Sequence, residues 1–404
     1  MQTMSLTHKF DKDKLIAINT SDVYNGIMGD GTLTPVDELK GQFKKTIQKG
    51  DILFSEIRPA NRRFAKVTAS DCTDFVVSTK LMVLRKFNNE VDSDYFYYCL
   101  TNQPFLETLQ RRAENRIGSF PQITFDLLSN YAFSIPPLEE QKDIASIIAS
   151  IDRKIELNRQ INDNLEAMAK QLYDYWFVQF DFPNEEGKPY KSSGGAMVWN
   201  EKLHLSIPSN WEAIPLSEIM DYAGGSQPPA SEFIEEYRDG YVRFVQIRDY
   251  YSNSHITYIP IRKSNKLCAE TDIMIARYGA SLGRICYGLN GAYNVALAKV
   301  SPKVKEYTEY LRIFLMSDGF YNKINSIGQR AAQAGFNKDD IENILIPFPT
   351  NNRCIIEFNK KMQPYFFARL QNDKEIITLT KQRDELLPLL MNGQVSVNYH
   401  LSDD

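Results

Sequence analysis

Apolar side chains recur every three or four residues along two long stretches of the chain. The first stretch carries Ile144, Ile148, Ile151, Ile155, Ile161, Leu165, Met168, Leu172 and Tyr175. The second carries Ile355, Phe358, Met362, Phe366, Leu370, Ile377, Leu386 and Leu390. This spacing is typical of the apolar seam of a coiled coil. It predicts long helices over residues 137–180 and 351–395, the first of them roughly 60 Å long at about 1.5 Å per residue.

Neither helix can bury its apolar stripe alone. Two long helices of one chain most simply pack against each other in antiparallel orientation, which would place the segments that precede them at opposite ends. The alternative is that each helix packs only on the segment before it. The residues at the predicted ends fit helix termini, because Pro136-Pro137 suits a first helical turn and Gly393 suits a helix end.

The segments before the two helices repeat one another. Lys49–Phe54 corresponds to Glu270–Ile275, Tyr95–Leu100 to Tyr310–Leu315, and Phe125-Asp126 to Phe336-Asn337. The first segment predicts strands at Leu15–Ile18, Ile52–Ile57, Phe75–Leu84 and Asn130–Ile135, and a helix at Ser93–Arg112. The second predicts strands at Val242–Ile247, Ile256–Ile261 and Ile273–Ala276. A repeat of this length indicates a duplicated module rather than a solenoid.

These elements predict an α+β (mixed α/β) chain with a pseudo-twofold internal repeat. Residues 1–136 and 211–350 form two globular domains, 137–180 and 351–395 form the long helices, 181–210 form a polar linker, and 396–404 form a tail. The second domain opens with Trp211-Glu212 and Gly224-Gly225, and the first shows no such opening. We therefore expect the first domain to be short, to have further sequence upstream, or to be completed by the residues after Gly393.

Composition narrows the class of protein. The formal net charge of −4 does not favour binding of nucleic acid through overall positive charge, although a local basic face remains compatible with it. Five cysteines without a CxxC pair argue against a zinc site and a disulfide framework, and they favour a reducing cytoplasm. No apolar run approaches the about 18 residues that a membrane-spanning helix needs.

Catalytic motifs are missing from the sequence. The four histidines occur in no metal-binding spacing, and the chain has neither a phosphate-binding glycine loop nor a nucleophile elbow. Asp51 and Asp272 precede equivalent predicted strands, and we interpret them as carboxylates that stabilise the entry to those strands. The sequence therefore predicts no catalytic residue and no metal site on this chain.

Loops rich in arginine and amide side chains are the best candidates for binding. Arginine can bond the O6/N7 edge of guanine with two hydrogen bonds, and Asn or Gln can do the same with adenine. In the first domain the candidates are Arg58, Asn61, Arg62, Arg63, Lys66, Arg111, Arg112, Arg116 and Gln122. In the second they are Gln227, Arg248, Arg277, Tyr278, Arg284, Gln329, Arg330 and Gln333. The alternative interpretation is that these residues belong to ordinary solvated loops and helix ends.

Several short segments together resemble the specificity subunits of type I restriction-modification systems. They are Ile135–Gln141, Leu157-Asn158-Arg159, Gly187–Gly195, Ile207–Glu212, Gly224–Pro228 and Leu386–Val395, and the similarity covers the whole chain. The resemblance implies two target recognition domains separated by an antiparallel coiled coil. Each domain would read one half of a bipartite double-stranded DNA site, and the helices would set the gap between the halves.

The same resemblance implies a prokaryotic, cytoplasmic and non-catalytic subunit. It implies partners: two modification subunits that methylate adenine with S-adenosylmethionine, and restriction subunits that use ATP and magnesium as motor-nucleases. The modification subunits would dock on the coiled coil, through the seam residues Ile144, Ile148, Ile151, Ile155, Leu165, Leu172, Leu370 and Leu386. The alternative function is a coiled-coil assembly scaffold that does not read DNA sequence.

Overall fold

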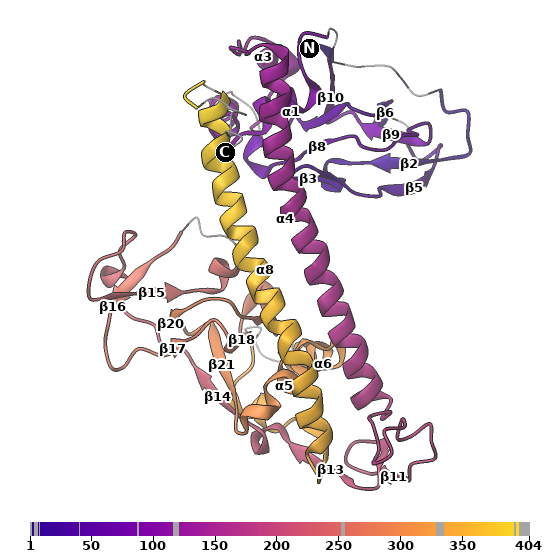
Figure 1. The fold of residues 1–404 in the computed structure, drawn as a ribbon, viewed down its shortest axis with the longest axis vertical. Coiled ribbons are helices and arrows are strands. Elements are labelled where there is room, and N and C mark those ends of the chain that lie inside the picture. Colours follow the sequence, from indigo (N-terminus) through magenta and orange to yellow (C-terminus); the bar gives the residue numbers. More distant parts are fainter. Residues whose placement is uncertain are drawn as a thin grey trace, which may run out of the picture. The chain divides into compact units, whose positions relative to one another are not determined.

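The computed structural model describes residues 2–3, 7, 9–39, 41–86, 89–115, 121–251, 255–328, 335–391 and 393–395. The chain divides into two compact units, Met1–Asn158 with Glu375–Asp404, and Arg159–Lys374. Two long helices contribute to both units: α4 (Leu138–Tyr173) and α8 (Arg353–Met391), shown in Figure 1. The predicted long helices are therefore present.

The first unit contains two four-stranded sheets. One has the order β1 (Gln2–Thr3), β10 (Leu81–Arg85), β7 (Ile52–Ser55), β8 (Phe64–Lys66). The other has the order β5 (Thr32–Pro35), β2 (Lys14–Ile18), β9 (Phe75–Ser78), β6 (Phe43–Lys45). Neighbouring strands are antiparallel except β2 and β9, which are parallel. The short strands β3 (Val23–Tyr24) and β4 (Ile27–Met28) form a hairpin, and the helices are α1 (Ser93–Thr101), α2 (Gln103–Glu114) and α3 (Phe125–Ser129).

The second unit contains two four-stranded sheets with the same strand orders as those of the first unit. Its sheets have the orders β14 (Met220–Gly224), β21 (Leu297–Pro302), β18 (Ile273–Ala276), β19 (Ile285–Cys286), and β16 (Tyr258–Pro260), β15 (Tyr241–Val245), β20 (Gly291–Tyr293), β17 (Leu267–Cys268). The parallel pair recurs as β15 and β20. The helices are α5 (Thr308–Met316), α6 (Asp318–Gly328) and α7 (Lys338–Glu342). The predicted internal repeat is therefore a repeat of the fold. Among the described residues of the first unit, β1 is the counterpart of β14, and no strand corresponds to β13 (Trp211–Pro215).

Two continuous elements predicted from the sequence are divided in the structure. The helix predicted over Ser93–Arg112 is interrupted at Asn102, whose side-chain oxygen accepts a hydrogen bond from the Phe105 N–H at 3.0 Å and so begins a new helix. Pro104 falls in the first turn of α2, where its missing N–H costs nothing. The strand predicted over Phe75–Leu84 becomes β9 and β10, which belong to different sheets.

The strand predicted at Asn130–Ile135 is wrong, because residues 131–137 adopt no regular structure. In the second unit the corresponding segment is β22 (Leu345–Pro349), which pairs along its whole length with β13 (Trp211–Pro215). The described residues of the first unit provide no partner strand for residues 131–137. The apolar pattern is the same in both units, and strand formation depends on the partner.

The predicted linker over residues 181–210 is also wrong, because the segment is folded into the second unit. It contains a hairpin of β11 (Met197–Asn200) and β12 (Leu205–Pro208). Phe182 stacks on both Tyr190 and Trp211, with ring centroids 4.9 and 5.3 Å apart. The Asp181 carboxylate accepts hydrogen bonds from the backbone N–H and the hydroxyl of Ser192. Buried aromatic rings therefore hold a stretch that looks polar and turn-rich in sequence.

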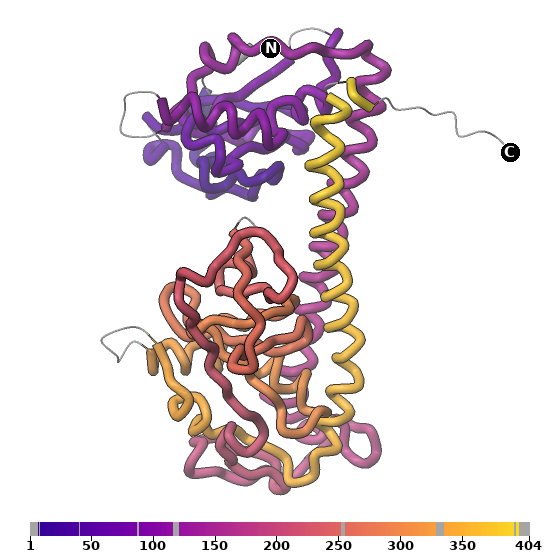
Figure 2. The backbone as a smooth tube through the Cα atoms, turned by 90° about the vertical axis from the view of Figure 1, so that its left-hand side faces the viewer, coloured from indigo at the N-terminus to yellow at the C-terminus, as the bar shows by residue number. Residues whose placement is uncertain are grey.

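In the first unit, α4 and α8 pack on each other and on α1. Ile148 of α4 is fully buried beside Tyr95 of α1 and Leu387 of α8, and the two helix segments run side by side in both views (Figures 1 and 2). A polar contact also joins the two helices, because Arg383 of α8 lies 2.9 Å from the Asp152 carboxylate of α4. Both packing modes considered from the sequence are therefore present in this unit.

In the second unit the two helices are again paired and antiparallel. Asn162 donates to Asp373 at 2.8 Å, and Arg369 contacts Glu166 at 2.7 Å, so the residue number rises along α4 as it falls along α8. At the C-terminal end of α4, Tyr173 packs against Phe358 of α8.

The end of α8 in the first unit agrees with the prediction, because Gly393 has a left-handed φ of 64° and its N–H bonds the Leu390 carbonyl.

Replacing Ile148 with Ala should lower the free energy of unfolding by about 2–5 kcal/mol, because it opens a cavity in the seam of the first unit. The matched control is Ile377→Ala, which removes the same atoms from a helical position that is 55% exposed. Urea denaturation followed by circular dichroism measures both. Equal losses for the two variants would contradict the packing described for α4.

Candidate nucleic-acid interface

The hairpin loops after β7 and β18 have the same length and the same closing hydrogen bond. Each contains a single 3-10 turn, Pro59–Asn61 in the first unit and Gly279–Ser281 in the second. The loops close with equivalent hydrogen bonds, from the Ser55 N–H to the Arg63 carbonyl at 2.8 Å and from the Ala276 N–H to the Arg284 carbonyl at 2.9 Å. The two arginine-rich loops predicted from the sequence are therefore counterparts in three dimensions.

Arginines of the first loop occupy positions that the second loop fills with glycine. Gly279 and Gly283 have φ angles of 71° and 77°, and the equivalent Arg58 and Arg62 have φ angles of 47° and 55°. A left-handed backbone costs a residue with a Cβ atom about 1–2 kcal/mol, and such strain is concentrated at functional sites. The first loop therefore retains two cationic side chains at a cost in stability that the second loop avoids.

The cations of the first loop differ in their availability. Arg62 is half-buried and donates from Nε to Asn25 at 2.8 Å and from Nη1 to Gln103 at 2.9 Å, so it links the loop to its neighbours. Lys66 forms an ion pair with Asp94. Arg58 and Asn61 are exposed at the surface. Arg62 and Lys66 thus have protein partners that a DNA contact would have to replace.

Helix α2 adjoins this loop in the first unit. The Ala60 N–H donates to the side-chain oxygen of Gln110 at 3.1 Å, which fixes the loop beside the end of α2. Arg111 and Arg112 follow in the last turn of α2 and are exposed, with Arg112 over the ring of Tyr131. The structure thereby brings two of the predicted clusters together.

The predicted residues of the second unit are more varied in environment. Arg277 lies 5.0 Å from the Tyr278 ring centroid and donates to the Val295 carbonyl at 3.2 Å, and Tyr278 itself is 42% exposed. Gln227 and Arg248 are exposed.

The remaining predicted residues are one in the first unit and four outside the described part of the chain. In the first unit Gln122 donates to Glu56 at 3.0 Å. The predicted residues Arg116, Gln329, Arg330 and Gln333 lie outside the described residues.

The structure also identifies Tyr24 and Tyr251, two side chains that the sequence patterns missed. Arg63 lies over the ring of Tyr24, and Arg284 lies over the ring of Tyr251, with distances of 5.5 and 3.8 Å from the guanidinium carbon to the ring centroid. Each tyrosine precedes its arginine by more than 30 residues in sequence, so no local pattern could reveal the pairing.

Half of the predicted seam residues are buried in the structure. Ile144, Ile148, Ile155 and Leu370 are buried inside the chain, and Ile151, Leu165, Leu172 and Leu386 are half-buried. A fully buried side chain cannot contact a partner unless the chain opens, so these positions hold the helices to their own units. The exposed apolar side chains on α4 and α8 are Leu157, Ile161, Met168, Phe367, Ile377 and Leu389.

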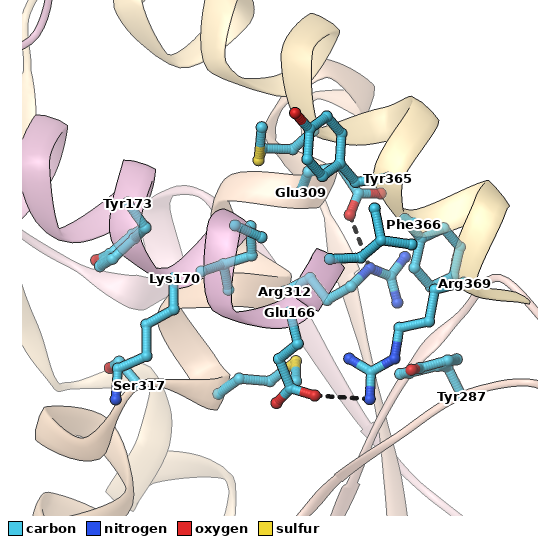
Figure 3. A pocket seen from close by; sticks show the side chains of 15 residues that line it. Glu166, Lys170, Tyr173, Tyr287, Glu309, Arg312, Ser317, Tyr365, Phe366 and Arg369 are labelled. Atoms are coloured by element: carbon cyan, nitrogen blue, oxygen red, sulfur yellow. Dashed lines mark hydrogen bonds and ion pairs between the residues drawn. The ribbon is translucent and has the colours of Figure 1, made fainter. Parts of the chain in front are cut away.

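A polar cluster lies in the seam between α4, α5 and α8 of the second unit (Figure 3). Arg312 donates to Glu309 at 3.0 Å and lies 3.6 Å from the Phe366 ring centroid, next to a cavity of about 70 Å³. Burial raises the pKa of Glu309, and the adjacent guanidinium opposes that rise. Both residues are almost fully buried, so the pair joins α5 to α8 rather than facing solvent.

The described residues contain no group of three or more His, Cys, Asp or Glu side chains placed to hold a metal ion. Burial raises the pKa of Cys286 to about 11, so its thiol stays protonated near neutral pH. Asp51 and Asp272 each accept a backbone N–H three residues earlier, at 2.9 and 2.8 Å, which agrees with their predicted role at the strand entries. Among the described helices, none is long and apolar enough to cross a membrane.

Comparison with known families accounts for this duplicated scaffold. The model of the type I restriction modification DNA specificity domain matches residues 6–167 and again residues 208–386. The chain belongs to this family. It carries two copies of the domain and is a non-catalytic specificity subunit.

Specificity subunits from two organisms are similar to this chain in sequence. The HindI specificity subunit of Haemophilus influenzae is 29% identical over 97% of both chains. The MjaIX specificity subunit of Methanocaldococcus jannaschii is 27% identical over 76% of this chain and 70% of the relative. The crystal structure of the type I restriction-modification S subunit from M. genitalium shares the fold, with a TM-score of 0.53, 18% identity, and coverage of 96% of this chain and 92% of that one.

The left-handed backbone of Arg58 predicts that its replacement by glycine raises stability while it lowers DNA affinity. Arg58→Gly should be more stable than Arg58→Ala by about 1 kcal/mol, because only glycine relieves the strained backbone. Both variants should lose DNA affinity to a similar extent if the side chain contacts DNA. Thermal unfolding gives the first difference and fluorescence polarisation the second. Equal stability of the Ala and Gly variants would contradict a strained Arg58.

Proposed function

We propose that each domain of this specificity subunit reads one half of a bipartite double-stranded DNA sequence, through the loops described above. The supporting observation is that the same hairpin and strand scaffold occurs twice with different side chains on it. Loops on a constant scaffold are where proteins commonly vary their specificity. The left-handed positions of the loops, arginine in one unit and glycine in the other, are one such difference.

An acidic chain is compatible with this function. Phosphate contacts supply affinity that depends on salt, and contacts to base edges supply sequence discrimination. A small number of exposed cations on each domain is enough for both roles. Arg58, Arg111 and Arg112 in the first unit and Arg248 in the second have the required exposure.

We further propose that the chain works as part of a larger assembly in the cytoplasm of a prokaryotic cell. Two modification subunits would dock on α4 and α8, using exposed side chains such as Leu157, Met168 and Ile377 instead of the buried seam. They would methylate adenine with S-adenosylmethionine, and restriction subunits would contribute ATP- and magnesium-dependent translocation and cleavage. None of these cofactors is assigned to this chain.

Methylation mapping tests the proposed function directly. The chain is expressed with its modification subunit in a host without DNA methylation, and methyladenine is located by long-read sequencing. A split motif with a fixed gap is the expected result. An intact complex that methylates nothing would favour the alternative of an assembly scaffold without sequence reading.

Variants in the two units should affect different half-sites. Arg58→Ala should relax or weaken recognition of one half of the motif, and Arg248→Ala should do so for the other half, because the two residues belong to separate domains. The readout is the methylation level at genomic sites with single mismatches. If either variant altered both halves equally, the division of labour between the domains would be refuted.

The length of the helices should determine the gap. Removing one heptad from α4 and one from α8 preserves the apolar seam and shortens each helix by about 10 Å, since the rise is about 1.5 Å per residue. The methylated motif of this variant should keep both half-sites and change the number of unspecified bases between them. An unchanged gap would contradict the proposed ruler role.

A further inference from the structure

One arrangement of side chains is common to both recognition domains. In the first unit Arg63 lies over Tyr24, and in the second Arg284 lies over Tyr251. The arginines follow equivalent 3-10 turns at the starts of β8 and β19. The two domains therefore place a cation at the same point of the same hairpin.

The tyrosines are also structurally equivalent. Each comes two residues after an aspartate whose carboxylate accepts the backbone N–H at the start of a short 3-10 turn. The bonds run from the Asn19 N–H to Asp22 at 2.7 Å, and from the Gln246 N–H to Asp249 at 2.9 Å. Both turns follow the strand that forms the parallel pair in its sheet, β2 in the first unit and β15 in the second. The tyrosines therefore occupy the same position in the sequence after these strands, although Tyr24 belongs to the short strand β3 and Tyr251 caps the 3-10 turn Ile247–Tyr250.

Both stacks face solvent. Tyr24 is 56% exposed and Tyr251 is 64% exposed, and both arginines are half-buried. Arg63 uses Nη1 to donate to the Ser21 carbonyl at 3.0 Å. Arg284 has no hydrogen-bond acceptor among the described residues, and it borders a surface groove of about 350 Å³ with Ser281 and Tyr251. The Tyr251 and Ser281 hydroxyls lie 3.2 Å apart, which ties the ring to the loop.

A guanidinium that lies on an aromatic ring has one face covered and its N–H edge pointing outward. The ring attracts the cation and restricts its rotamers, so less entropy is lost when the edge binds an anion. A phosphate group accepts two parallel N–H bonds from such an edge. Arg284 can offer such an edge to an oxyanion, and Arg63 can do so with the N–H groups other than the Nη1 donor to the Ser21 and Val23 carbonyls.

The recurrence of the arginine–tyrosine stack in both domains indicates whether it contacts bases or the phosphate backbone. A contact that reads a base should differ between domains that recognise different half-sites, whereas a contact to the phosphate backbone can be the same. Another stack in the second unit, Arg277 on Tyr278, illustrates the difference, because Glu56 and Ile57 occupy the equivalent positions in the first unit. The shared stacks follow the pattern expected of a backbone contact.

We propose that the Arg63–Tyr24 and Arg284–Tyr251 stacks are phosphate anchors that set the position of each domain on the DNA and carry no sequence information. This proposal rests on the proposed function of the two domains. Arg63 and Arg284 are then positioned by their tyrosines, and half-site identity is read by residues that differ between the domains.

The test measures affinity and discrimination separately. The wild-type complex with the modification subunit and its Arg284→Ala variant are titrated with the cognate duplex and with a duplex carrying one wrong base in either half-site. Arg284→Ala should weaken binding to all duplexes by the same factor, about tenfold. It should also reduce the slope of log affinity against log salt by about 0.9, the value for one phosphate. Arg353→Ala, which removes an exposed and paired arginine from α8, is the matched control and should change neither quantity.

Variants of the tyrosine test the role of the ring. Tyr251→Phe keeps the stack and should retain most of the affinity, whereas Tyr251→Ala should approach the loss of Arg284→Ala. Tyr24→Phe and Tyr24→Ala should behave in the same way with Arg63. Circular dichroism of each variant checks that the unit is still folded.

Each alternative outcome is distinct. A loss of discrimination in one half-site upon Arg284→Ala would make the arginine a base reader and overturn the proposal. Unchanged affinity and salt slope would remove the stack from the DNA interface. If the wild-type complex failed to bind any duplex, the proposed function of the domains would fail before the anchor could be judged. Ethylation of single phosphates should show interference at one position that disappears with Arg284→Ala.

Discussion

The structure depends on the burial of two helical stripes against more than one partner. In each unit a further helix packs against α4 and α8, α1 in the first and α5 in the second. In the first unit α1 supplies Tyr95 and Tyr98, and the Tyr98 hydroxyl donates to Asp152 at 3.0 Å. Arg383 of α8 contacts the same carboxylate, so three helices share one polar contact inside an apolar seam.

In the second unit different side chains fill the seam between the helices. The repeat aligns α5 with α1, so that Arg312 occupies the position of Tyr97. Arg312 contacts Glu309 and the Phe366 ring, where the first unit uses aromatic and hydroxyl groups. A buried ion pair adds little net stability compared with an apolar contact, but its geometry permits few alternative registers. The two seams therefore differ in side chains and agree in backbone, which is how a duplicated scaffold can diverge without losing its fold.

Much of this organisation could be predicted from the sequence, because it depends on periodicity. The three-and-four spacing of apolar residues predicted both long helices, and the echo of Lys49–Phe54 in Glu270–Ile275 predicted a fold that repeats. The failures have a common physical cause. Phe182 and Trp211 hold the predicted linker through a contact between residues that are distant in sequence. Residues 131–137 carry the apolar pattern of a strand without a described partner strand to pair with. Both outcomes are decided by tertiary contacts that a local pattern does not contain.

The candidate interface shows the same limit at the level of single residues. Composition alone identified the loop that carries Arg58 to Lys66, but not that Arg58 and Arg62 adopt a backbone conformation that glycine prefers. Nor could it show that Arg62 and Lys66 are bonded to other residues of the chain. Arg62 is linked to Asn25 and Gln103, so its contribution to DNA binding would act largely through the shape of the loop. The strain at two arginines and the tyrosine beneath a third indicate that the hairpin is built to present charge at fixed points, at a cost in stability that its glycine-containing counterpart does not bear.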